Sequence, residues 1–159
     1  MPGSVRTFPK RKIIYASAAA AAVVAALAVA GSVETKRPVQ QDGLPKAAQI
    51  FIATHCPGET PVLALREYDD FRRSYEVTLV DGTKMRFSRN GEWKSFESHA
   101  RPVPAALVPP QISGYLDTNF PGTAVMELSI SGRDIELGLD NRVELTFDSR
   151  TFLLRDFDD

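Results

Sequence analysis

Few residues of this chain belong to the types that do chemistry. It has two histidines, His55 and His99, and one cysteine, Cys56. Neither histidine has a second ligand at metal-site spacing, and the sequence contains no nucleophile elbow, Walker loop or dinucleotide-binding fingerprint. Cys56 has no partner for a disulfide within the chain, so it is expected to be a semi-buried thiol at a helix end. We therefore predict no catalytic residue.

Acidic side chains are abundant but offer no defined metal site. Asp69-Asp70 is expected at a hairpin tip, where aspartate commonly supports the turn, and residues 156–159 hold a second acidic cluster. Neither cluster reaches the number of oxygen ligands that calcium prefers, so we expect solvated carboxylates, with a calcium site as the alternative. We predict no metal and no cofactor.

The N-terminal segment, 1–30, has the features of an export signal. Basic residues precede an uncharged run, Ile13 to Ala30, which consists mostly of Ala and Val and ends in Ala28-Val29-Ala30, the small-x-small pattern that signal peptidase accepts. The run is near the lower length limit for spanning a bilayer, so an uncleaved membrane anchor is the alternative. We expect an exported protein, either in the periplasm or anchored in the inner membrane and facing the periplasm. Membrane contact is expected only if this segment stays uncleaved.

Removing the signal leaves a mildly acidic chain. Arg6, Lys10, Arg11 and Lys12 leave with it, and 15 basic residues then oppose 20 acidic ones, a net charge of −5. A domain of this charge without a basic stripe is a poor candidate for binding nucleic acid. Its length suffices for one modest core without disulfides.

Two parts of the remaining chain correspond in sequence. Residues 44–58 match 108–122, each with a proline at its second position and Pro-Gly at its end, and 83–87 match 143–147. Two diverged copies of one unit explain these matches together. The expected division is a polar tether at 31–43, a first repeat at 44–98, a Pro-containing linker at 99–104 and a second repeat at 105–159.

Each copy is expected to open with a helix and to continue in strands. Apolar residues three or four apart follow Pro45 and Pro109, and proline is tolerated in a first helical turn. After each Pro-Gly stop the apolar residues alternate, which predicts strands. Glycine in third position favours three-residue hairpin loops at 80–82 and 89–91, and this register places Phe87 opposite Trp93.

The second copy lacks both of these loop glycines. Arg142 stands in place of Gly82, and Thr151 in place of Gly91. A left-handed backbone at Arg costs about 1 kcal/mol, and a β-branched Thr tolerates it less well. We therefore expect the turns of the second copy to change type or to loosen.

The helix and strand motifs resemble those of a known family. Asn119-Phe120-Pro121-Gly122 ends a predicted helix, and strand motifs Tyr-Glu-Val-x-Leu-x-Asp-Gly and Phe-x-x-x-Gly-x-Trp begin at Tyr75 and Phe87. They are similar to those of the β-lactamase-inhibitor-like, PepSY-like domains, a group of mostly uncharacterised exported bacterial proteins. The likeness covers 44–96 and 108–157, although Cys56 departs from the aromatic residue expected before Pro-Gly.

The resemblance carries an expected fold and a weaker expectation of function. It implies an α+β fold of two tandem PepSY-like repeats, each with one helix packed on a four-stranded antiparallel β-meander. It also implies that the open sheet face clamps a partner protein. No inhibitor contact residue transfers by motif.

Three surfaces are candidates for contact with a partner. The hairpin tip at 68–73 combines aromatic residues with arginine, the types enriched at binding hot spots. The outer face of the first sheet presents basic residues, and a register with Phe147 opposite Leu153 would put two large apolar residues on the outer face of the second. The candidate partner-binding residues are Tyr68, Phe71, Arg72, Arg73, Arg86, Lys94, Phe152 and Leu154.

The sequence thus favours a non-catalytic exported module that binds another envelope protein or a peptide, with an inhibitor-like role implied by the resemblance. The alternative is a membrane-anchored structural or sensory module of the envelope, in which Ile13 to Ala30 is retained.

Overall fold

The computed structural model describes residues 35–69 and 72–159. The expected signal segment, including the alternative anchor Ile13 to Ala30, lies outside the described residues. In the part that is described, no helix is long and apolar enough to cross a membrane. Short 3-10 turns occur at Gln41–Gly43 and Ala105–Leu107. The helices are α1 (Lys46–His55) and α2 (Pro110–Asn119), and the strands are β1 (Thr35–Pro38), β2 (Pro61–Asp69), β3 (Arg72–Leu79), β4 (Lys84–Ser88), β5 (Trp93–Glu97), β6 (Val125–Ser131), β7 (Asp134–Leu139), β8 (Glu144–Asp148) and β9 (Leu154–Asp158).

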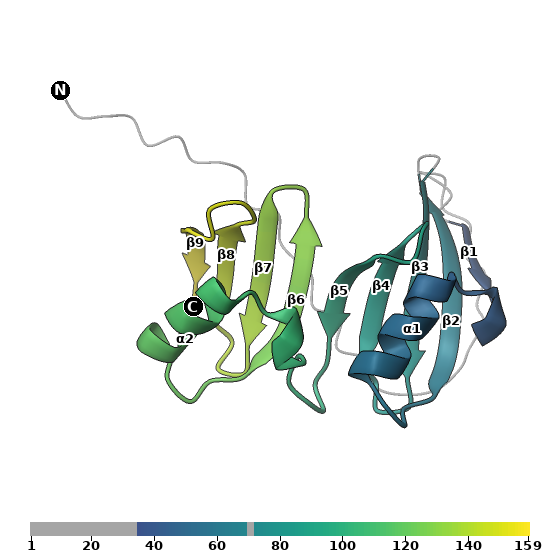
Figure 1. Cartoon of the computed structure of the whole chain (residues 1–159), viewed down its shortest axis with the longest axis horizontal. Coiled ribbons are helices and arrows are strands. Elements are labelled where there is room, and N and C mark those ends of the chain that lie inside the picture. Colours follow the sequence, from purple (N-terminus) through teal and green to yellow (C-terminus); the bar gives the residue numbers. More distant parts are fainter. Residues whose placement is uncertain (1–34, 70–71) are drawn as a thin grey trace. The chain divides into compact units, whose positions relative to one another are not determined.

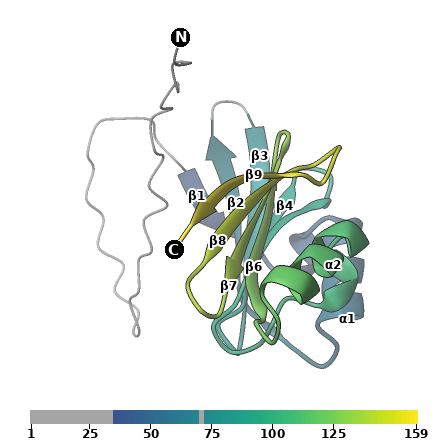
Figure 2. The ribbon, with the colours of Figure 1, turned by 90° about the vertical axis from the view of Figure 1, so that its left-hand side faces the viewer.

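The described strands form one continuous sheet. Its nine strands lie side by side in sequence order, β1 to β9, and every neighbouring pair is antiparallel. Helix α1 lies over the N-terminal half of the sheet, β1 to β5, and α2 lies over the C-terminal half, β6 to β9 (Figure 1). Both helices cover the same face, as the turned view in Figure 2 shows. The opposite face, called the open face below, carries no helix of the described chain.

This architecture corrects the expected fold. We expected two tandem repeats, each with a helix on its own four-stranded meander, whereas the described chain is mostly β and forms a single nine-stranded sheet with two helices. The pairing of β5 with β6 makes the difference. Two separate meanders would each have left an edge strand with unpaired backbone groups at this position, and joining them satisfies both edges.

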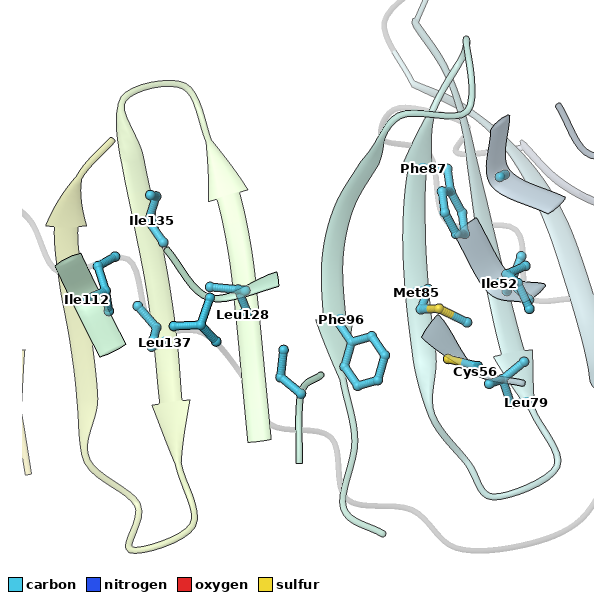
Figure 3. Packing of buried hydrophobic residues seen from close by; sticks show 14 of the residues in the cluster. Ile52, Cys56, Leu79, Met85, Phe87, Phe96, Ile112, Leu128, Ile135 and Leu137 are labelled. Carbon is cyan, nitrogen blue, oxygen red and sulfur yellow. The ribbon is translucent and has the colours of Figure 1, made fainter. Parts of the chain in front are cut away.

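The junction between β5 and β6 is also a hydrophobic contact. Phe96 pairs with Leu128 across it, and both side chains are 0% exposed. Figure 3 shows the two on adjacent strands, between the core residues under α1 and those under α2. The buried residues therefore form one cluster that runs through both halves. Burying two such side chains contributes about 1.5–3 kcal/mol each, which favours one sheet over two.

The segment expected to be a polar tether, 31–43, is structured in its described part. β1 pairs with β2, and Lys36 forms an ion pair with Glu67 at 2.6 Å. A 3-10 turn follows, and Leu44 next to it is buried in the core. β1 therefore covers the edge that β2 would otherwise expose.

The two helices lie where the apolar spacing predicts them. Pro45 and Pro109 each stand at the N-cap, where the absent proline N–H has no helical partner to lose. Both helices end with the same geometry, in which the N–H of the C-cap residue, Cys56 or Phe120, donates to the carbonyl four residues earlier. Their buried residues, Ala48 and Ile52 in α1 and Ile112 and Leu116 in α2, face the sheet.

The predicted hairpin register is confirmed in the N-terminal half. Val77 lies opposite Met85, and Phe87 lies opposite Trp93. Gly82 and Gly91 both have positive φ, 83° and 86°, as the three-residue loops require.

We expected both corresponding turns of the C-terminal half to change type or loosen, but only the second of them differs. Arg142 adopts the left-handed conformation of its counterpart Gly82, with φ 72°. Between β8 and β9 the left-handed residue is Phe152, φ 54°, and not Thr151. The loop is one residue longer there, because Phe147 pairs with Leu154 where we expected Leu153.

The Pro-containing linker at 99–104 is held on both sides. The N–H of Val103 donates to the carbonyl of Val125 at 2.7 Å, and the Val103 side chain is buried. The guanidinium of Arg101 lies 3.0 Å from Asp81 and 3.8 Å from Glu59, both in the N-terminal half. The linker thus ties the start of β6 to the turn region beside α1.

Candidate functional site

The hairpin tip between β2 and β3 is a cluster of arginine around one tyrosine. Tyr68 pairs with Arg73 across the hairpin, and the guanidinium carbons of Arg73 and Arg66 lie 5.3 Å and 5.7 Å from the centre of the Tyr68 ring. Both distances are within the range of a cation–π contact. Arg72 is exposed at the start of β3, whereas Phe71 lies outside the described residues. The tip therefore presents an aromatic ring held between two positive charges.

The basic candidates in the middle of the sheet lie on a different face. Side chains alternate along a strand, so Tyr68 and Arg73 share the helix-covered face with the buried Tyr75, whereas Arg86 lies on the open face. Arg86 pairs with Glu76 at 3.2 Å. Lys94 sits in the bulge of β5, and its Nζ lies 3.7 Å from Glu92. The structure does not bring the tip and these two residues into one site.

The two apolar candidates, Phe152 and Leu154, are not on the open face. Leu154 pairs with Phe147 and so shares the helix-covered face, and Phe152 packs against the core. The expectation was wrong because the β8–β9 turn carries one residue more than the β4–β5 turn, which reverses the faces beyond it. Asp148 fixes this turn, since its Oδ1 accepts hydrogen bonds from the N–H groups of Arg150 and Thr151. These bonds lower the pKa of Asp148 to about 2.

A row of carboxylates crosses the open face. The register pairs Glu97 with Glu127 across the β5–β6 junction and then continues through Gly138 to Glu144 and Asp158. These four acidic residues, the acidic row, face away from the helices, because Glu97, Glu127 and Glu144 alternate with buried core residues and Asp158 lies opposite Glu144. Like charges opposite one another on neighbouring strands destabilise a sheet. The row thus stores an electrostatic repulsion that a positive partner would relieve.

Glu127 is the residue on which this repulsion acts most strongly. Partial burial, with the charges of Glu97, Glu144 and Glu136, raises the pKa of Glu127 from 4.5 to about 7. Gly138 provides the room for its side chain, because a Cβ there would lie 3.2 Å from the Cβ of Glu127. Close to neutral pH this carboxyl is therefore divided between its neutral and charged forms.

The groups that could do nucleophilic or metal chemistry are not assembled. Cys56 is 1% exposed, and burial raises the pKa of its thiol, which makes it a poorer nucleophile. The ring of His55 packs against the ring of Phe51. Nε2 of His99 lies 3.7 Å from the carboxylate of Glu97. Among the described residues, no three His, Cys, Asp or Glu side chains are placed to hold a metal ion.

Sequence reasoning missed the acidic row. The strands and their outward carboxylates follow from alternation, but Glu97 and Glu127 lie opposite each other only because β5 pairs with β6. The available signal was charge, since residues 105–159 hold ten acidic and four basic residues. That imbalance pointed to an acidic surface in the C-terminal half.

The arrangement of strands, caps and turns can now be compared with known proteins. The sequence profile of the family described as "Putative beta-lactamase-inhibitor-like, PepSY-like" matches residues 73–155. The chain belongs to this family. None of the curated proteins searched matches this PepSY-like chain.

Solved structures of Bacteroides proteins are similar to this PepSY-like chain. A "putative periplasmic protein from DUF2874 family" of Bacteroides vulgatus has a TM-score of 0.77 and 34% identity, over 80% of this chain and 99% of that one. A "putative calcium-regulated periplasmic protein" of Bacteroides thetaiotaomicron has a TM-score of 0.74 and 35% identity, over 78% and 97%. A "putative periplasmic protein of unknown function" of Bacteroides vulgatus has a TM-score of 0.74 and 28% identity, over 79% and 100%.

Proposed function

We propose that this PepSY-like chain is a non-catalytic periplasmic module that binds another envelope protein or a peptide through the open face of its sheet. The observation that carries the proposal is the acidic row, Glu97, Glu127, Glu144 and Asp158, on the face over which the described residues place no helix. A partner that presents lysine or arginine to this row would lower the repulsion between the carboxylates. The partner would therefore be a protein or peptide with a basic contact surface.

The location is part of the proposal. The basic start, apolar run and small-residue exit of 1–30 are those of an export signal, and the three similar structures are named as periplasmic. A non-catalytic role is supported by the burial of the Cys56 thiol, which is 1% exposed. An inhibitor-like role fits the family description and would make the partner an enzyme.

The hairpin tip is the second contact that we propose. Tyr68, held between Arg66 and Arg73, is an aromatic residue whose geometry is already fixed before binding, which lowers the entropy cost of contact. Arg72, at the start of β3, is exposed and adds a further guanidinium. Because Tyr68 and the acidic row lie on different faces, the two contacts can be tested separately.

The test is an affinity pull-down from envelope extract with three versions of the protein: unchanged, with Glu127→Lys and Glu144→Lys, and with Tyr68, Phe71 and Arg72 changed to alanine. We expect one protein or peptide to be retained by the unchanged protein and lost with the lysine variant. Glu76→Lys with Arg86→Glu is the matched control, since it exchanges the charges of an ion pair on the same face. Each extract is run with and without calcium, because one similar structure is named calcium-regulated.

Retention that is equal for all versions would contradict the open face and the tip together. Loss with the alanine variant alone would move the proposed contact to the tip. Measuring the turnover of recovered enzymes with and without the protein then tests the inhibitor-like role.

The alternative is an envelope module that keeps Ile13 to Ala30 as an anchor, since this uncharged run is near the lower length limit for spanning a bilayer. Fractionation and N-terminal sequencing decide it. Mature protein that begins near Gly31 in the soluble periplasmic fraction eliminates the anchor, and intact N-terminus in the membrane fraction supports it.

A further inference from the structure

The last strand, β9, corresponds in register to β5 but lacks the neighbour that β5 has. β5 and β9 follow β4 and β8 with the same type of irregularity, between Arg86 and Phe87 in one hairpin and between Thr146 and Phe147 in the other. β5 is covered along its other edge by β6, whereas β9 ends the order of the described strands. Figure 1 shows β5 within the sheet and β9 at its outer edge. The pairing of β5 with β6 therefore shows how a further strand could pair with the outer edge of β9.

The exposed fractions of two corresponding phenylalanines, Phe96 and Phe157, show the effect of a neighbouring strand. Phe96 lies opposite Met85, and Phe157 lies opposite Leu145 in the matching position. Phe96 is 0% exposed because Leu128 of β6 lies opposite it, whereas Phe157 is 46% exposed. The ring of Phe157 is already partly ordered, since it stacks on Phe120 with centres 6.2 Å apart. An apolar side chain in the position of Leu128 would cover the exposed part of this ring.

The side chains on either side of Phe157 define what else a neighbour must carry. Asp156 and Asp158 point to the open face, where Asp158 also follows Glu144 in the acidic row. Every residue of β9 is exposed. A strand laid against this edge would place one side chain opposite Phe157 and its two flanking side chains opposite these aspartates. Lysine or arginine at the flanking positions would complement both carboxylates.

The backbone of β9 is also prepared for a further strand. The N–H of Phe157 donates to Oδ1 of the adjacent Asp156 at 3.0 Å. Because the N–H of Leu139 donates to the carbonyl of Val143, the backbone of Leu145 bonds to β7, and Phe157 opposite Leu145 turns its N–H away from β8. The N–H of Phe157 therefore points toward the outer edge of β9, where its hydrogen-bond acceptor is the side chain of Asp156. A carbonyl of an added strand could take this hydrogen bond, and the Asp156 carboxylate would then be available to a basic side chain.

From these observations we propose that the outer edge of β9 binds an extended peptide segment of the pattern basic–apolar–basic as a tenth, antiparallel strand. The apolar side chain covers Phe157, and the basic side chains lie opposite Asp156 and Asp158. A second copy of this chain is a poorer occupant. Pairing β9 with β9 would bring the aspartates of two chains together, and β1 is short and ends in Pro38, which has no N–H to donate.

The proposal shares Asp158 with the acidic row of the open face, and its own observations are the exposed edge of β9 and the N–H of Phe157. The probe is a nine-residue peptide with blocked termini, Ser-Thr-Thr-Lys-Leu-Arg-Thr-Thr-Ser. It is titrated into the protein purified from the cell envelope. Binding is followed by fluorescence polarisation and by amide NMR shifts. We expect saturable binding with the largest shifts in β8 and β9.

Backbone methylation separates strand addition from plain charge attraction. In an added strand, alternate N–H groups point toward β9 and away from it. Of two peptides methylated on the two alternate sets of nitrogens, one should bind as the parent does and the other at least about tenfold more weakly, the loss that one or two hydrogen bonds produce. Equal binding of both methylated peptides would overturn the proposal.

Charge reversal supplies the matched control. Asp158→Lys should weaken the basic peptide about tenfold or more and strengthen a peptide with glutamate in place of its lysine and arginine. Glu92→Lys makes the same charge change in the exposed β4–β5 turn and should leave binding of both peptides unchanged. Phe157→Ala should weaken both peptides.

Three results would contradict the proposal: no saturable binding at low salt, shifts outside β8 and β9, or concentration-dependent self-association of the protein with amide shifts in β9. The last would assign the edge to a second copy.

Discussion

The two halves of the sheet are built on the same plan and differ in what surrounds them. Residues 44–98 hold eight basic and eight acidic residues, and the strands of this stretch, β2 to β5, lie between β1 and β6. Residues 105–159 hold four basic and ten acidic residues, and the C-terminal half ends in the exposed β9. The difference shows that matched sequence positions can have opposite roles. A buried phenylalanine at the junction supports the core, and its counterpart at the edge is available for contact.

The largest expected effect tests the two phenylalanines against each other. Phe96→Ala should lower the free energy of unfolding by about 3–5 kcal/mol, because it leaves a cavity where the halves join. Phe157→Ala should cost about 1 kcal/mol or less, since nearly half of its side chain is already in water. Urea denaturation of both variants measures the difference. Similar losses would mean that the two positions are not distinguished by their neighbours.

The next effect separates backbone strain from lack of space at two glycines with the same conformation. Gly91 has φ 86°, and a Cβ there would lie 2.8 Å from the Cβ of Pro45 and 2.9 Å from the N of Ala48. Gly82 has φ 83° and open space around it. Gly82→Ala should therefore cost about 1–2 kcal/mol from the left-handed backbone alone, and Gly91→Ala about 1–3 kcal/mol more from the clash with α1. Equal losses of stability in thermal or urea unfolding would show that α1 moves aside.

A third effect concerns charge in the C-terminal half. The pKa of Glu127 is about 7 in the folded chain and 4.5 ordinarily, so between these values the folded state holds its proton more tightly than the unfolded state. Stability should therefore fall as pH rises from about 4.5 to about 7 and should change no further from this residue above that. Glu127→Gln should remove this fall and, after allowance for solvent screening, stabilise the protein at pH 8 by about 1–2 kcal/mol.

The matched control is Glu76→Gln in the N-terminal half, which removes one partner of the Glu76–Arg86 ion pair. It should cost at most about 1 kcal/mol at pH 8, with the opposite sign. Chemical denaturation between pH 4 and pH 8 measures both. A Glu127→Gln variant that is destabilised at pH 8 would contradict the repulsion within the acidic row.

The smallest effect exchanges the two β-turn residues that correspond between the halves. Arg142 adopts φ 72° in the position that Gly82 holds in the N-terminal half. Arg142→Gly should raise the melting temperature slightly, by the equivalent of less than about 1 kcal/mol, since relief of backbone strain is partly offset by the flexibility of glycine in the unfolded chain. Gly82→Arg should lower it. Calorimetry that finds the opposite pair of signs would show that Arg142 makes compensating contacts.

Local features of the fold could be predicted from the sequence because they depend on neighbours in the chain. The Pro-initiated helices, their Pro-Gly stops and the loops ending in Gly82 and Gly91 follow from backbone restrictions of single residues. The pairing of Phe87 with Trp93 follows from side-chain alternation once the loop length is known. The predicted partner of Phe147 was wrong by one residue. No glycine indicates the length of the β8–β9 loop, which depends instead on the hydrogen bonds that Asp148 accepts from the loop backbone.

Which strand edges pair with one another depends on the whole folded chain. The sequences of β5 and β6 do not by themselves predict that these two strands pair, since any two exposed strand edges with apolar inner faces could do so. That one pairing turned two expected units into a single sheet, buried Phe96, set Glu97 against Glu127 and left β9 as an edge. The core residues, the turn residues and the charged residues could be predicted from the sequence alone. Long-range pairing determined which of those charges face one another and which core residue is uncovered. Every strand edge offers the same backbone N–H and C=O groups, so the local sequence does not specify the partner strand.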